Sequence, residues 1–240
     1  MKKAIPSLIT CLALFSGCIS IACSDNGNLA LAGYFILIAA VFDFLDGMFA
    51  RMLRAITAFG RQLDSLADAI SFGVAPAMII FRLMADSLKN RVEIDGFAGY
   101  VFLYIPFFLV IFAVLRLAKF NIDDTQTKSF RGLPTPATAM FVSALGVLSE
   151  SQAGIPLQNL TGNILFLLIV TVVFSVLMVT NIRMFSLKFE DMSLKNNWLR
   201  YVLLISSLII LIIMKIPGIA LIIAIYIILS VAANLVNIKV

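Results

Sequence analysis

The chain has 240 residues, of which 62% are hydrophobic and only 13% are charged, and its mean hydropathy is +1.07. A soluble domain of this length needs a more polar surface, so the composition excludes an ordinary globular protein and indicates a polytopic membrane protein. The net charge is +5 and the chain contains no histidine, so a carboxylate is the most plausible general base.

Long apolar runs without the alternation of barrel strands predict an all-α transmembrane bundle of about eight helices. In chain order the predicted spans are Ile5–Cys23, Ala30–Leu53, Gly60–Met84, Phe97–Lys119, Leu133–Leu148, Gly162–Thr180, Tyr201–Met214 and Gly218–Val236. The seventh span is short, and Lys215 to Gly218 predicts a tight turn before the eighth. We expect a single integral membrane domain over residues 1–240, with motifs in residues 5–145 and additional spans in residues 162–237.

The basic residues predict the orientation of these spans. If the N-terminus is cytoplasmic, the outer side receives few of the 18 Lys and Arg residues, namely Arg82, Lys89, Arg91 and Lys215. This asymmetry follows the positive-inside rule and predicts the orientation. We expect an integral protein of the cytoplasmic membrane. A cleaved signal peptide is the alternative interpretation of the first span, because Lys2 and Lys3 precede an apolar stretch that ends at Cys23.

Four aspartates lie in the second and third predicted spans, where a carboxylate costs about 3 kcal/mol at the bilayer centre. The pattern is Asp43-x-x-Asp46-Gly47-x-x-Ala50-Arg51-x8-Gly60-x3-Asp64-x3-Asp68. Spacings of three and four residues put each pair on one helix face. The connector Met52–Phe59 allows the two helices to pack antiparallel, so that the pairs face each other near the cytoplasmic surface. Oxygen-rich clusters of this kind suit hard divalent cations.

Two other interpretations of the aspartates remain open. In the first, the carboxylates are solvated at helix ends and paired with Arg51, Arg54 and Arg61. In the second, the chain is a divalent-cation transporter, a class of protein that also uses intramembrane carboxylates.

The complete pattern resembles the signature of the CDP-alcohol phosphotransferase family. That family has a six-helix core and a di-metal site, and it transfers a phosphatidyl-type group from a CDP-linked lipid to an alcohol, releasing CMP. The resemblance implies two divalent cations, Mg²⁺ or Mn²⁺, and a homodimer. The implied metal ligands are Asp43, Asp46, Asp64 and Asp68, with Asp68 also the catalytic base. The implied CDP-binding residues are Asp46, Gly47, Ala50, Arg51 and Gly60.

Two further blocks, residues 64–76 and residues 116–137, resemble the phosphatidylserine synthase subfamily. This resemblance implies CDP-diacylglycerol as donor and L-serine as acceptor, with membrane lipids as surroundings and no nucleic acid partner. Arg116 and Arg131 are candidates for binding the serine carboxylate, and Asn121 for orienting the amino acid. The alternative for both arginines is that they reach toward lipid head groups at helix ends.

The alternative acceptors are glycerol 3-phosphate and inositol phosphate, which are dianions and need several convergent basic residues. The sequence also departs from the family in the first span. Related enzymes have Pro-Asn there, whereas Pro6 is followed by Ser7, and Thr10 is the polar residue that remains for a nucleotide contact.

Overall fold

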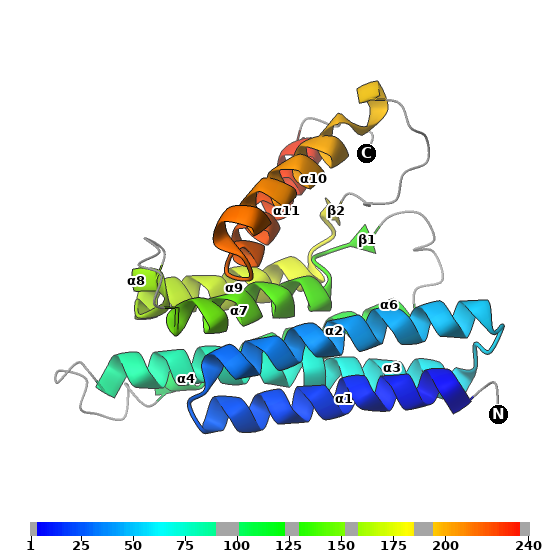
Figure 1. The fold of residues 1–240 in the computed structure, drawn as a ribbon, viewed down its shortest axis with the longest axis horizontal. Helices are drawn as coiled ribbons and strands as arrows, with labels where there is room; N and C mark the ends of the chain where they lie inside the picture. Colours follow the sequence, from blue (N-terminus) through cyan, green and yellow to red (C-terminus); the bar gives the residue numbers. More distant parts are fainter. Residues whose placement is uncertain (1–3, 90–100, 123–129, 152–157, 185–193, 236–240) are drawn as a thin grey trace.

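The computed structural model of the chain describes residues 4–89, 101–122, 130–151, 158–184 and 194–235 (Figure 1). The helices before residue 123 are α1 (Ala4–Asp25), α2 (Leu29–Met52), α3 (Ala58–Asp68), the π-helix η1 (Ala69–Val74), α4 (Ala75–Lys89), the 3-10 helix η2 (Ile105–Phe107) and α6 (Phe108–Ile122). The later helices are α7 (Thr135–Ser149), α8 (Gln158–Thr161), α9 (Ile164–Val179), α10 (Leu194–Met214) and α11 (Gly218–Leu235). The strands β1 (Phe130–Arg131) and β2 (Arg183–Met184) pair antiparallel.

These elements confirm the prediction of a helical membrane bundle. Among the described residues, 6 helical segments are long and apolar enough to cross a membrane, and α7 and α9 are shorter apolar helices of 15 and 16 residues. These helices lie at the positions of the predicted spans, and the predicted start of the fourth span at Phe97 lies outside the described residues. The apolar part of α10 begins at Asn197, four residues before the predicted start of the seventh span at Tyr201, and the non-helical Asn197 separates it from the first turn of the helix. The predicted turn is present, and Lys215 adopts a positive φ of 54° in it.

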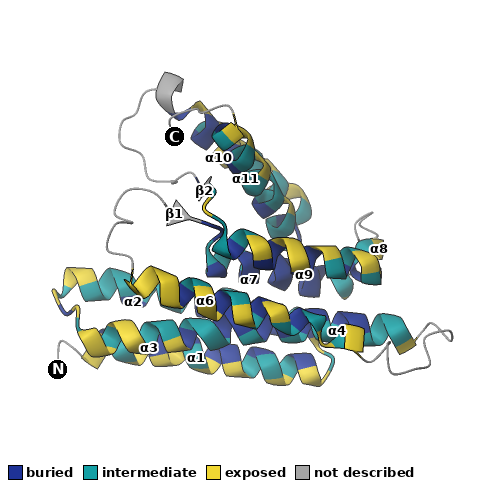
Figure 2. Ribbon diagram, turned by 180° about the vertical axis from the view of Figure 1, so that it is seen from behind, coloured by how far each residue is buried: buried dark blue, intermediate teal, exposed yellow. Residues whose placement is uncertain are grey.

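The helices from α1 to α6 form one elongated layer, and the later helices lie along one side of this layer (Figures 1 and 2). Within the layer α1 packs along α2, while α7 packs on α2 and α9 on α6. The hairpin of α10 and α11 is inclined to the layer and attaches through α11 to α7. The beginning of α1, the end of α2, the beginning of α3 and the end of α6 meet at one end of the layer (right in Figure 1).

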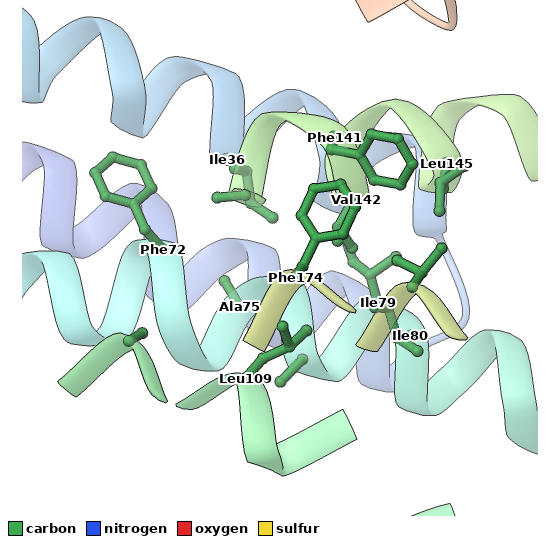
Figure 3. Packing of buried hydrophobic residues seen from close by; sticks show 14 of the residues in the cluster. Ile36, Phe72, Ala75, Ile79, Ile80, Leu109, Phe141, Val142, Leu145 and Phe174 are labelled. Carbon is green, nitrogen blue, oxygen red and sulfur yellow. The ribbon is translucent and has the colours of Figure 1, made fainter. Parts of the chain in front are cut away.

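The apolar core lies between this layer and α7. Ile79 lies beside Val142 of α7 and Phe174 of α9 there (Figure 3), and Phe72 and Leu109 belong to the same buried cluster. The rings of Phe141 and Phe174 have centroids 4.5 Å apart. By contrast, many large apolar residues of α1, α2 and α10 are exposed, and Figure 2 marks exposed positions along these helices. Such exposed faces are expected where acyl chains take the place of water.

The helix that begins at Ala58 changes its winding directly after Asp68. Pro76 has no N–H to donate to the carbonyl one α-helical turn earlier, and its ring crowds that turn. The widened turn of η1 accommodates this, with the N–H of Ala75 donating to the carbonyl of Ile70. Single π-turns within α-helices are often found at functional sites.

Small residues bring α1 very close to η1. The hydroxyl of Ser71 donates to the carbonyl of Ala13 at 3.1 Å, and an added Cβ at Gly17 would lie 2.8 Å from the Cα of Ser71. Backbone atoms cannot move aside as a flexible side chain can. Gly17 is therefore required for the contact between the two helices.

Gly17→Val is expected to lower the thermal stability of the purified protein in detergent, because it forces α1 away from η1. Overpacking of this kind costs about 1–3 kcal/mol. The control is Gly47→Ala, where an added Cβ would meet only the side chain of Arg51, 3.7 Å away at the nearest. Equal melting temperatures for Gly17→Val and the wild type would contradict the close packing.

Candidate metal centre

Three carboxylates converge where α2 passes α3. Asp43 on α2 and Asp64 and Asp68 on α3 each place one oxygen within 4.8 Å of the others, and all three side chains are half-buried. Asp43 lies about 14 Å along the helix axis from the end of α2 at Met52, given a rise of 1.5 Å per residue. The predicted antiparallel arrangement of α2 and α3 is thus present, and the carboxylates lie inward from one end of the bundle.

Asp46 occupies a different position from the other three. Its carboxylate lies outside the cluster of three, is only 6% exposed, and accepts a hydrogen bond of 2.5 Å from the hydroxyl of Thr10 on α1. It still interacts electrostatically with Asp43, Asp64 and Asp68. The structure therefore brings three of the four predicted ligands together and holds the fourth one helical turn away.

The cluster fits a divalent cation. Carboxylates this close repel one another unless a cation or bound protons neutralise them, and oxygen ligands suit Mg²⁺ and Mn²⁺. Within the described ranges the ion pairs are Arg82–Asp86 and Lys89–Asp86, so none joins the four aspartates to Arg51, Arg54 or Arg61. The last three residues are all exposed.

The predicted CDP-binding residues lie on α2 and at the start of α3, beside the cluster. The guanidinium of Arg51 lies next to Gly47, which has no other close neighbour that an added Cβ would meet. Ala50 is half-buried. The N–H of Gly60 donates to the hydroxyl of Thr57 at 2.9 Å, which caps α3. Gly47 and Ala50 lie four and seven residues after Asp43, so these small residues share its face of α2.

The predicted acceptor residues lie on α6 and in β1. Arg116 interacts electrostatically with Asp68, and its Nη1 donates to the hydroxyl of Thr135 at 3.4 Å. Its Nε is buried and has no hydrogen-bond partner within the described part of the chain. Asn121 donates from Nδ2 to the hydroxyl of Ser65, next to Asp64, at 2.8 Å. The backbone of Arg131 lies in β1, but its side chain is outside the described part of the structure.

Two residues near Arg116 were not among the predicted site residues, although Thr135 lies within the block of residues 116–137. Thr135 begins α7 and is fully buried, and Tyr226 on α11 interacts electrostatically with Arg116. No motif marks α11, so its approach to Arg116 follows only from the packing of α11 on α7. Thr10, by contrast, was singled out in the sequence. It was predicted as a contact for the nucleotide, whereas in the structure it donates to Asp46.

Comparison with known proteins identifies the class. The model of the CDP-alcohol phosphatidyltransferase family matches residues 3–161. The chain belongs to this family.

Three proteins similar to this chain are named for the synthesis of serine-containing lipids or for transfer to serine. An archaetidylserine synthase of Methanothermobacter thermautotrophicus is 37% identical over 155 residues, which cover 62% of this chain and 62% of that protein. A CDP-diacylglycerol–serine O-phosphatidyltransferase of Helicobacter pylori is 35% identical over 182 residues, 74% of this chain and 70% of the relative. One of Bacillus subtilis is 34% identical over 136 residues, 57% and 71% of the two chains. The match thus spans less than two thirds of the archaeal relative.

These matches confirm the predicted resemblance to the family. All three relatives are named as synthases or transferases, and none of the three as a transporter. The family match ends at Thr161, so it includes the complete aspartate pattern and leaves α9, α10 and α11 outside.

Proposed function

We propose that the chain transfers the phosphatidyl group of CDP-diacylglycerol to the hydroxyl of L-serine, forming phosphatidylserine and CMP. The observation that carries this proposal is the convergence of Asp43, Asp64 and Asp68 in a chain of this family. The names of the relatives, together with the motif blocks in residues 64–76 and 116–137, support serine as the acceptor.

Asp43, Asp46, Asp64 and Asp68 would hold two divalent cations, Mg²⁺ or Mn²⁺. When bound, these ions neutralise the carboxylates and stabilise the charge on the pyrophosphate oxygens of the donor. Gly47 and Ala50 leave room for the CDP moiety on α2. Gly60 is the proposed CDP-binding residue at the start of α3. Arg51, which is exposed beside Gly47, supplies positive charge to the CMP that leaves.

Asp68 is the proposed base. The serine hydroxyl gives its proton to the Asp68 carboxylate and forms a bond to the lipid-side phosphorus, while the bond from that phosphorus to the oxygen of CMP breaks. In-line attack places the acceptor on the side opposite to the leaving group. Arg116 lies on the Asp68 side of the cluster, so the acceptor is expected between these two residues.

Arg116 is the strongest candidate for binding the serine carboxylate. Its buried Nε finds no hydrogen-bond partner among the residues that the structure describes, and a buried donor without a hydrogen bond costs about 1–3 kcal/mol. A carboxylate that accepts from Nε would remove this cost. Asn121, which donates to the hydroxyl of Ser65, is the proposed residue for orienting the amino acid, and Arg131 is retained as a second candidate on the basis of its sequence position.

The site is proposed to face the cytoplasm, because the basic residues follow the positive-inside rule and both substrates are then reached from that side. The surrounding partners are membrane lipids, and no nucleic acid is involved. A homodimer is the assembly that the family resemblance implies. Size-exclusion chromatography with light scattering in detergent would measure that assembly.

The test is CMP release by the purified full-length protein in detergent with CDP-diacylglycerol and Mg²⁺ or Mn²⁺. Parallel reactions contain L-serine, glycerol 3-phosphate, inositol phosphate or no acceptor. Release that requires serine and metal is the expected result. A phosphorylated acceptor that supports release instead would overturn serine but keep the family chemistry. No release from folded protein with any acceptor would contradict the proposed reaction.

A further inference from the structure

The hydroxyl of Thr10 reaches from α1 across to Asp46 on α2. Its Oγ1 lies 2.5 Å from Oδ2 of Asp46, and both side chains are buried, at 4% and 6% exposure. Hydroxyl-to-carboxylate hydrogen bonds have lengths of about 2.5–2.7 Å because the acceptor is charged. The distance therefore fits a donor bound to an ionised carboxylate.

Thr10 has a second acceptor within reach, the carbonyl of Pro6 at 3.0 Å on the same helix. A hydroxyl carries one proton, so it serves one of the two acceptors at a time. The Pro6 carbonyl already accepts the N–H of the helical turn. The carboxylate is closer and charged, so the proton of Thr10 belongs to Asp46.

The packing of α1 fixes this contact. Beyond Thr10, the buried face of α1 carries Gly17 against the Cα of Ser71, and the hydroxyl of Ser71 donates to the carbonyl of Ala13 at 3.1 Å. These two contacts set the position of α1 against η1. Thr10 is thereby held at a set height beside Asp46.

We propose that Thr10 is a positioning residue, which holds Asp46 by one carboxylate oxygen so that the other oxygen is presented to a divalent cation. The inference rests on the proposed metal site. Asp46 lies outside the cluster of Asp43, Asp64 and Asp68, so it needs its own support to serve as a ligand with them. Outer partners of this kind commonly change metal affinity by about 10- to 100-fold when they are removed.

The test measures Mn²⁺ binding to the purified full-length protein by isothermal titration calorimetry, without substrates. Thr10→Val keeps the shape of the side chain but removes the hydroxyl, and Thr10→Ser restores a hydroxyl. Ser20→Ala is the matched control, because it removes a buried hydroxyl from the same face of α1 at the other end of the helix. Thr10→Ala serves as the second variant if Thr10→Val is not recovered in a folded form.

Thr10→Val, or Thr10→Ala in its place, is expected to weaken Mn²⁺ binding by about tenfold or more. Thr10→Ser and Ser20→Ala should remain close to the wild type. Unchanged binding in the variant without the hydroxyl would overturn the inference, and so would equal weakening by Ser20→Ala. If the wild-type protein itself binds no Mn²⁺, the proposed metal site fails, which is a separate result from a failure of Thr10 alone.

Discussion

Asp68→Asn is expected to abolish turnover while CDP-lipid binding is largely retained. The amide has nearly the shape of the carboxylate but cannot accept the proton of the acceptor hydroxyl. Loss of a general base lowers kcat by about 10²- to 10⁴-fold, and the loss of one proposed metal ligand adds to this. Asp68 belongs to the cluster of three carboxylates and interacts electrostatically with Arg116, so both roles meet at this side chain.

The measurement is CMP release with L-serine, together with binding of CDP-diacylglycerol to the same preparation. Asp86→Asn is the matched control, because Asp86 is paired with Arg82 at the distant end of α4 and should tolerate the same change. A near wild-type rate for Asp68→Asn would show that the base is another group. Equal losses in both variants would indicate a general effect on the fold.

Removal of either Asp43 or Asp64 is expected to eliminate the metal response. Each contributes an oxygen to the cluster from a different helix, so Asp43→Ala and Asp64→Ala each leave only two of the three converging carboxylates. Direct ligands should matter more than the outer partners, whose removal costs about 10- to 100-fold in affinity. We therefore expect Mn²⁺ affinity to fall by about 100-fold or more, together with the activity.

Calorimetric titration with Mn²⁺ checks this expectation, with CMP release measured across a range of metal concentrations. Asp25→Ala is the control, since Asp25 is an exposed aspartate at the end of α1, away from the cluster. Unchanged Mn²⁺ titrations of both Asp43→Ala and Asp64→Ala would contradict the di-metal proposal, even if both variants lost activity.

The sequence by itself determined the membrane class, the helical bundle and the positions of most spans. These follow from local properties, because a continuous apolar run of sufficient length has to be helical in lipid. The spacing of the aspartates also determined which carboxylates share a helix face. The family resemblance rests on the same aspartates, and the match of the family model to residues 3–161 agrees with that resemblance.

Contacts between distant segments were decided only by the tertiary structure. The start of α10 at Leu194, the pairing of β1 with β2 and the approach of Tyr226 to Arg116 leave no periodic signal in the sequence. The sequence predicted four carboxylates facing one another, whereas packing placed Asp46 against Thr10. The physical reason is that periodicity specifies which face of a helix is buried, while the side chains that meet there depend on how closely two helices approach.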